Sequence, residues 1–143
     1  MKIMVSACLM GQNCKYNGGN NYSEKLLKFT EGHEVIPVCP EVAGGLPTPR
    51  TPCEIVNGKI MSAKGEIRDS EFRKGAGECV AIAKKEKIDL AILQSRSPSC
   101  GVKQVYDGTF SGKLIDGSGI FASMLAENGF KVMDVEDLQV DPD

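Results

Sequence analysis

The sequence predicts an α/β fold: one domain with a mainly parallel sheet, helices on both faces in a Rossmann-like arrangement, and a small inserted hairpin. The 143 residues amount to a single domain, residues 1–143, whose tail from about residue 139 we expect to be frayed. Short apolar runs alternate with segments of helical periodicity, which is typical of parallel strands joined by right-handed crossovers. An Asn-Gly step between two apolar pairs indicates the hairpin.

The first part of the chain is expected to form a strand, a short helix and a second strand. Residues 3–7 are a short apolar run and predict the first strand. Residues 23–29 begin with Ser-Glu and carry apolar side chains on one side, which favours a short amphipathic helix. Residues 35–38 predict the second strand, and Pro37 within it indicates an edge position or an early strand end.

The middle of the chain predicts the hairpin and the longest helix. Residues 54–61 hold the Asn57-Gly58 step between apolar pairs, as in a tight β-hairpin turn. Residues 69–87 carry apolar side chains at spacings of three and four, which predicts a helix. Asp69 or Ser70 is expected to cap its start.

The last part of the chain predicts two further strands around one helix. Residues 90–93 are continuously apolar, as in a strand buried on both faces of a parallel sheet. A helix is expected from about residue 119 to Asn128-Gly129, a good helix end signal. Residues 131–133 are a weaker strand.

The composition excludes several classes of protein. Hydrophobic residues make up 41% and charged residues 25% of the chain, which is ordinary for a globular domain. The net charge of −2 gives no reason to expect bulk attraction to nucleic acid or an anionic membrane. The N-terminal apolar run is too short for a secretory signal peptide, and nothing approaches transmembrane length. We therefore expect a cytoplasmic protein.

The cysteines are the chemistry-bearing residues that stand out most. Six are present, and in a reducing compartment they indicate metal binding or catalysis ahead of disulfides. Cys8 and Cys39 directly follow the first two strands, and Cys100 lies a few residues past the strand at 90–93. Parallel sheets bind ligands beyond the carboxyl ends of their strands. Neighbouring strands lie about 4.8 Å apart, so side chains that follow them can surround one ligand. Three thiolates there could hold a [4Fe–4S] cluster and leave one iron open, as a Lewis-acid catalyst needs.

The cysteines also have other interpretations. Free cysteines are often simply small buried residues, and this alternative stays open for each of them. Cys14 could be a fourth ligand, a resolving thiol or a reservoir for sulfur, and Cys53 could lie near the site. Cys79 falls on the apolar face of the long predicted helix, where a core position is favoured.

Several polar residues in the same loops are candidates for substrate chemistry. Glu41, two residues beyond Cys39, could accept and donate a proton, although a solvated loop carboxylate is the plainer interpretation. Ser97 and Ser99 could bind substrate or position water, or merely form turns. Arg50 could bind an anionic group through its guanidinium, and the polar loop with Tyr16 could stack on or hydrogen-bond a heterocycle.

Six segments, taken together and in order, resemble the TudS family of thiouracil desulfidases, also known as YbbK-like proteins. They are residues 5–11 (VSACLMG), 14–18 (CKYNG), 38–41 (VCPE), 44–50 (GGLPTPR), 97–101 (SPSCG) and 106–112 (YDGTFSG). Two positions depart from the pattern. Lys15 stands where an arginine is usual, so the charge is kept without bidentate geometry, and Cys53 stands where a small residue other than cysteine is common.

The resemblance implies a function and a set of site residues. It implies a [4Fe–4S] cluster held by Cys8, Cys39 and Cys100, with catalytic roles for Glu41 and Ser97. The expected reaction is hydrolytic removal of sulfur from a thiolated pyrimidine base or nucleoside such as thiouracil, giving uracil and sulfide. We expect the substrate-binding residues to be Ser99, Arg50 and Tyr16.

Two other functions stay open at this point. The first is a thiol redox enzyme that uses Cys8 and Cys14, for which Lys15 is a weak source of thiolate stabilisation. The second is a non-enzymatic zinc or iron–sulfur binding module, such as a sensor.

Overall fold

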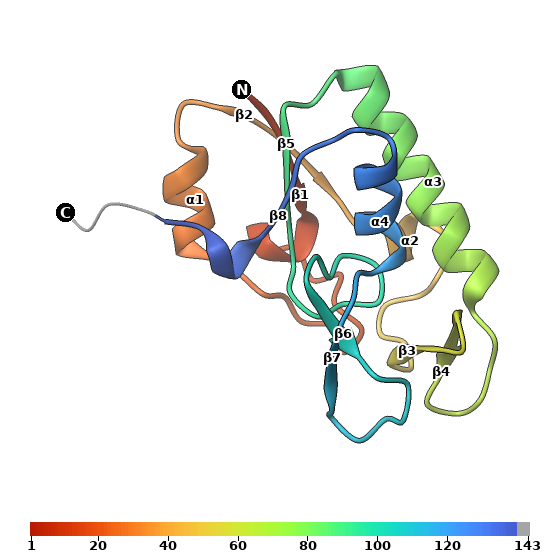
Figure 1. Ribbon diagram of the computed structural model, residues 1–143. Helices are drawn as coiled ribbons and strands as arrows, with labels where there is room; N and C mark the ends of the chain where they lie inside the picture. Colours follow the sequence, from red (N-terminus) through yellow and green to blue (C-terminus); the bar gives the residue numbers. More distant parts are fainter. Residues whose placement is uncertain (140–143) are drawn as a thin grey trace.

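A four-stranded parallel sheet forms the centre of the molecule (Figure 1). The computed structural model describes residues 1–139, so all but the first position of the expected frayed tail lies outside the described residues. The strand order is β2 (Glu34–Val38), β1 (Lys2–Ser6), β5 (Leu90–Leu93) and β8 (Val132–Asp134). Every neighbouring pair is parallel, which confirms the predicted α/β fold.

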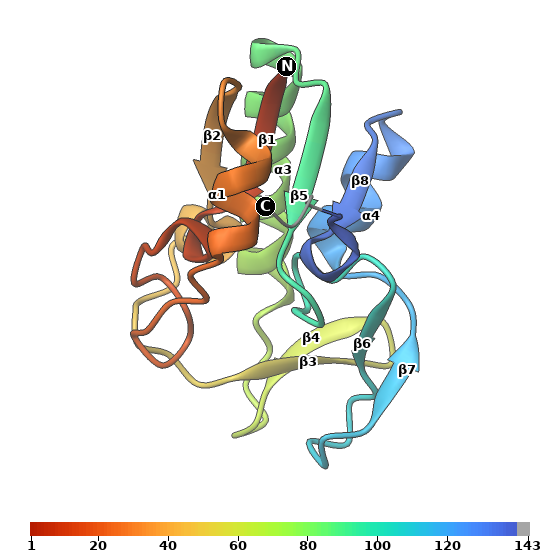
Figure 2. The ribbon, with the colours of Figure 1, turned by 90° about the vertical axis from the view of Figure 1, so that its left-hand side faces the viewer.

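Helices cover both faces of this sheet, as predicted. On one face, α1 (Glu24–Thr30) packs through Leu26 on apolar side chains of β1 and β5. On the other face, α3 (Asp69–Glu86) and α4 (Ile120–Glu127) share a second apolar core with the same strands. Figure 2 shows α1 in front of the sheet and α3 behind it. No helix within residues 1–139 has both the length and the apolar character that a membrane span requires.

The sequence signals within the strands and at α1 are confirmed. All four residues of β5 are buried, because helices cover this central strand on both sides. Pro37 lies in β2, which is an edge strand, so its missing N–H removes no hydrogen bond from the interior of the sheet. Ser23 caps α1, since its hydroxyl oxygen accepts a hydrogen bond from the backbone N–H of Leu26 at 3.2 Å.

The predicted cap of α3 is wrong. Arg68 occupies the cap position, and no side chain caps the helix there. The Asp69 carboxylate instead accepts a hydrogen bond from the Ile60 backbone N–H at 3.1 Å, which ties the start of α3 to β4 (Lys59–Ser62). The other carboxylate oxygen accepts from Arg73 Nε at 2.7 Å, so both oxygens are engaged by groups other than the first N–H groups of the helix.

Two small hairpins lie beyond the carboxyl ends of the parallel strands (Figure 2). The predicted one joins β3 (Cys53–Val56) to β4, and both turn residues have positive φ, 49° at Asn57 and 81° at Gly58. The other joins β6 (Gln104–Tyr106) to β7 (Leu114–Asp116) and was not predicted, because three-residue strands carry too little alternation. The single helical turn α2 (Pro40–Ala43) was missed for the same reason of length.

The strand order fixes where a ligand can bind. From β1 the chain runs to β2 at one edge of the sheet, then crosses through α3 to β5 on the other side of β1. Connections that leave in opposite directions open a crevice at the carboxyl ends of the strands. The ends of β1, β2 and β5 therefore meet at one place, beneath which the two hairpins lie.

Candidate functional site

Three cysteines from three strand ends line the same cavity. Cys8 lies in a 3-10 helix (Ala7–Met10) directly after β1, Cys39 immediately precedes α2, and Cys100 lies in the loop after β5. The cavity has a volume of about 570 Å³. Because the three segments end at neighbouring points of one sheet edge, their thiols face a common space.

The environment of these thiols disfavours free thiolates. Burial raises the pKa of Cys8, and the nearby Cys39 raises it further. Burial also raises the pKa of Cys100 well above its usual value, and both Cys8 and Cys39 add to that effect. Three mutually close cysteines in a poorly solvated site become thiolates when a bound cation compensates their charge.

The donor set fits an iron–sulfur cluster. A cubane cluster takes cysteine thiolates that are spread around its corners. Three cysteines that reach one cavity from three strand ends can supply such thiolates.

Two residues that the sequence analysis missed act on these sulfurs. The Asn21 side-chain amide donates to Cys8 Sγ at 3.5 Å. The nearby Ser6 hydroxyl lowers the pKa of Cys100 against the larger effect of burial, while its oxygen accepts from the Gln94 backbone N–H at 2.9 Å. Hydrogen bonds to sulfur are typical of protein-bound iron–sulfur clusters. Ser6 ends β1 only two residues before Cys8, which was an available signal, whereas nothing in the sequence marks Asn21.

Of the three remaining cysteines, two line the cavity and one lies in the core. Cys14 and Cys53 line the cavity, and the Cys39 thiol donates to the backbone oxygen of Cys14 at 3.9 Å. Burial raises the pKa of Cys14 to about 12 and that of Cys53 to about 11. Such thiols lack the depressed pKa that a thiol redox enzyme needs, which counts against the proposed use of Cys8 with Cys14. Cys79 is buried in the core beneath α3, as predicted.

Glu41 is held from both sides within the site. Arg50 Nε donates to Glu41 Oε1 at 3.1 Å, and the two side chains are only 7% and 17% exposed. The Ser99 hydroxyl donates to Glu41 Oε2 at 3.3 Å. Arg50 also donates to the backbone oxygen of Cys14 at 2.8 Å. The guanidinium thus fixes the carboxylate and the Cys14 loop, and these bonds occupy donors that a substrate anion would use.

The two serines near Cys100 have different surroundings. Ser97 lines the cavity, and its oxygen accepts hydrogen bonds from the backbone N–H groups of Ser99 and Cys100, each at 3.0 Å. Its hydroxyl therefore shapes the turn that carries Cys100 and keeps its own proton to donate. Ser99 is buried, and its hydroxyl bonds Glu41 from behind the cavity wall. The structure thus brings Ser97 to the site directly and Ser99 through Glu41.

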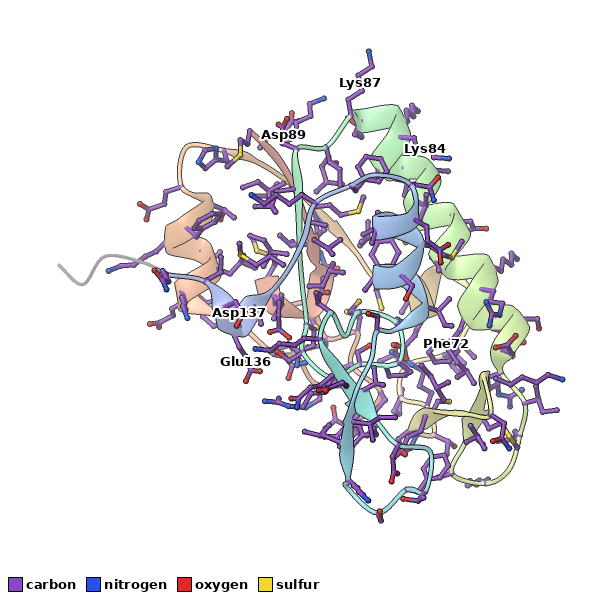
Figure 3. All side chains as sticks on the ribbon, viewed as in Figure 1. Phe72, Lys84, Lys87, Asp89, Glu136 and Asp137 are labelled. Atoms are coloured by element: carbon purple, nitrogen blue, oxygen red, sulfur yellow. The ribbon has the colours of Figure 1, made fainter. Side chains whose placement is uncertain are left out.

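The last residue of β8 and the residues that follow it hold the loop that carries Ser97. Ser95 donates to the buried carboxylate of Asp134 at 2.6 Å, and Arg96 makes two hydrogen bonds to Glu136, at 2.9 and 2.7 Å. Lys103 pairs with Asp137 at 2.8 Å. Figure 3 shows Glu136 and Asp137 at the end of the sheet where the site lies.

Aromatic side chains complete the cavity wall. Tyr16 lines it and is 42% exposed, with the Lys15 ammonium 5.8 Å from the centre of its ring. Tyr106 and Phe110 line it from the β6–β7 hairpin. Both lie in the segment 106–112, for which the sequence analysis proposed no role.

Comparisons with known proteins place the chain in one family. A family model described as 2-thiouracil desulfurase matches residues 3–137. The chain is 40% identical over 146 aligned positions to the uncharacterized protein YbbK of Bacillus subtilis (strain 168), covering 95% of this chain and 97% of that protein. Among solved structures, the [4Fe-4S]-dependent thiouracil desulfidase TudS superposes with a TM-score of 0.90 at 36% identity, covering 96% of this chain and 92% of that one.

These matches confirm the resemblance drawn from the six sequence segments. The family model spans almost the whole chain, and the YbbK relative is 40% identical over 95% of it. The chain therefore belongs to the 2-thiouracil desulfurase family.

Proposed function

We propose that this protein is a [4Fe–4S]-dependent desulfidase that hydrolyses the C–S bond of a thiolated pyrimidine such as 2-thiouracil. One observation carries the proposal: Cys8, Cys39 and Cys100 reach the same cavity from three strand ends, with Glu41 beside them. The family and the TudS structure, described as [4Fe-4S]-dependent, support the cofactor and the substrate class.

Cys8, Cys39 and Cys100 would hold the cluster as thiolates. When bound, it would supply a Lewis-acidic iron that carries no protein ligand and has affinity for sulfur. The Asn21 hydrogen bond would stabilise the Cys8 thiolate in that state, and the nearby Ser6 hydroxyl would favour the Cys100 thiolate.

Glu41 is the proposed proton-transfer residue. Arg50 and Ser99 fix the direction of its carboxylate, so that its remaining lone pairs can accept a proton from a water molecule. The water oxygen forms the new bond to the ring carbon, the C–S bond breaks, and both water protons end on sulfide or solvent. Ser97 lines the cavity and can orient that water through its free proton.

The remaining proposals concern substrate, domain and location. Tyr16 lies where it can contact a bound heterocycle, while Arg50 and Ser99 act on the substrate through Glu41. We propose that the chain works as a single domain, because both apolar cores share the same sheet. Reduced thiols are needed to assemble the cluster, which favours the cytoplasm, and the partner is a small thiolated base or nucleoside.

The test is an anaerobic assay on protein with its cluster assembled. Incubation with 2-thiouracil should release sulfide and uracil in equal amounts, without consuming a reductant, because hydrolysis transfers no net electrons. Cluster-free protein treated in the same way is the control. A brown protein that binds 2-thiouracil without releasing sulfide would refute the proposed activity and favour a sensor instead.

A further inference from the structure

Phe110 occupies an unusual place in the wall of the cavity. It lies in the loop between β6 and β7, lines the same cavity as the three cysteines, and is 39% exposed. Its φ of 57° places it in the left-handed region, which bulky side chains rarely adopt. Glycine would adopt this conformation freely, as it does at neighbouring Gly108 and Gly112. A phenylalanine here therefore strains the backbone and also exposes a large apolar ring to solvent.

The loop is tethered to the other hairpin. Glu54 of β3 accepts hydrogen bonds through Oε1 from the backbone N–H of Gly108 at 2.9 Å and of Phe110 at 3.2 Å. Gly108 also packs so closely on β3 that an added Cβ would lie 2.6 Å from the Ile55 carbonyl oxygen. The strained conformation of Phe110 is therefore held by contacts from a segment more than fifty positions away. Strain maintained in this way at a binding site points to a role for the side chain.

An aromatic ring at this position can do one thing that the polar residues of the cavity cannot. Every planar base presents a π-face, and an aromatic side chain stacks on it without needing a particular hydrogen-bonding edge. Polar groups such as Ser97 and Glu41 select donors and acceptors at the edge of a ring, whereas stacking selects flatness and aromaticity.

We propose that Phe110 is the stacking platform of the site and makes it select planar aromatic pyrimidines. The proposal rests on the proposed function, since it assumes that a pyrimidine enters this cavity. Tyr16 and Tyr106 are the rival platforms, but the Tyr16 ring already faces the Lys15 ammonium, and Tyr106 lies in the regular strand β6. Within residues 1–139, no cation lies over the Phe110 ring, and Phe110 is held in a strained backbone conformation.

The test compares uracil with 5,6-dihydrouracil, because both have the same carbonyl and N–H edge but only uracil is flat and aromatic. Binding of each to the cluster-loaded protein is measured anaerobically by equilibrium dialysis. Wild type should prefer uracil. Phe110→Leu, which keeps the bulk, should weaken uracil binding by roughly 5- to 150-fold, the usual range for stacking on a base, and leave dihydrouracil almost unaffected. Phe110→Trp should restore the preference.

A second variant separates this role from a structural one. Phe110→Gly should lose the preference for uracil while keeping an unfolding temperature close to wild type, since relief of strain offsets the added freedom of the unfolded chain. The matched control is Tyr22→Leu, which removes an exposed aromatic ring outside the cavity and should bind both ligands as wild type does.

The outcomes distinguish this proposal from the proposed function. Phe110-dependent binding of uracil in a protein that releases no sulfide would refute the reaction and support the platform. No preference for uracil in wild type, or loss of it in Tyr16→Leu but not in Phe110→Leu, would overturn the platform even if desulfidase activity is present.

Discussion

Arg50 and Glu41 form an almost fully enclosed ion pair at the edge of the cavity, with Arg50 Nε 3.1 Å from Glu41 Oε1. The pair sets the orientation of the carboxylate before any substrate arrives. A proton-transfer group fixed in this way needs no rearrangement during the reaction.

Glu41→Gln should lower turnover by roughly 10²–10⁴ while keeping the cluster, because the amide preserves shape but cannot accept the proton. The measurement is the desulfidase rate per mole of intact cluster. Ser97→Ala should lower the rate less, since another water molecule can replace part of a hydroxyl's role. Near wild-type turnover in Glu41→Gln would show that another group moves the proton, and loss of the cluster would show a structural role.

Single changes of Cys8, Cys39 or Cys100 to serine should remove most of the iron and acid-labile sulfide, because serine replaces a soft thiolate with a weak oxygen ligand. Iron content and visible absorbance of anaerobic protein measure this. Cys79→Ser is the matched control, as Cys79 lies in the core away from the cavity and should keep the cluster. A brown, active Cys39→Ser protein would exclude Cys39 as a ligand and point to Cys14.

Removal of the cluster in air should produce a disulfide between Cys14 and Cys39. Cys39 Sγ lies 3.9 Å from the backbone oxygen of Cys14 and both side chains line the cavity, so oxygen or peroxide can join two neighbouring thiols. Mass spectrometry of peptides cut without reduction detects the link as a loss of two hydrogens. Cys14→Ser should prevent it and Cys53→Ser should not. A dominant bridge between Cys8 and Cys14 would contradict the arrangement seen here.

Gly75→Ala should destabilise the protein by about 1–3 kcal/mol, as overpacking usually does. A Cβ at Gly75 would overlap the Pro40 carbonyl oxygen, so α2, which carries Glu41 and follows Cys39, would have to move. Chemical denaturation and cluster content measure the effect. Gly77→Ala in the same helix is the control, since its Cβ would meet only Met124 Cε at 4.0 Å. That change should be neutral or stabilise by up to about 1 kcal/mol. Equal behaviour of the two variants would show that α2 does not depend on this contact.

Asp134→Ala should cost about 1–3 kcal/mol, because it leaves the buried Ser95 hydroxyl without its acceptor. The loop with Ser97 and Cys100 would then lose one of its attachments, and cluster content should fall as well. Asp137→Asn is the control: it breaks a solvent-exposed ion pair with Lys103 and should change neither quantity measurably. Unchanged stability in Asp134→Ala would show that the neighbouring Arg96–Glu136 pair alone holds the loop.

The order of the main elements and the gathering of Cys8, Cys39 and Cys100 at one sheet edge could be predicted from the sequence because their signals are local. Apolar runs end at Cys8 and Cys39, and the continuous run of β5 ends shortly before Cys100. Because the strands are parallel, their carboxyl ends lie at the same edge of the sheet, and this does not depend on how the side chains pack. The short elements α2, β6 and β7 escaped prediction, since three or four residues carry too little periodicity.

Only the tertiary structure decided how the site is supported. Ser99 reaches Glu41 from 58 positions away, and Glu54 reaches Phe110 from 56 positions away. No local pattern encodes such pairs, because they depend on which loops the crossovers bring together. The sequence therefore determined which residues stand at the strand ends, and packing between loops decided their partners: Arg50 for Glu41 and Asp134 for Ser95. The physical reason is that backbone propensity and periodicity act over a few residues, whereas hydrogen bonds and close packing act between any groups that folding brings into contact.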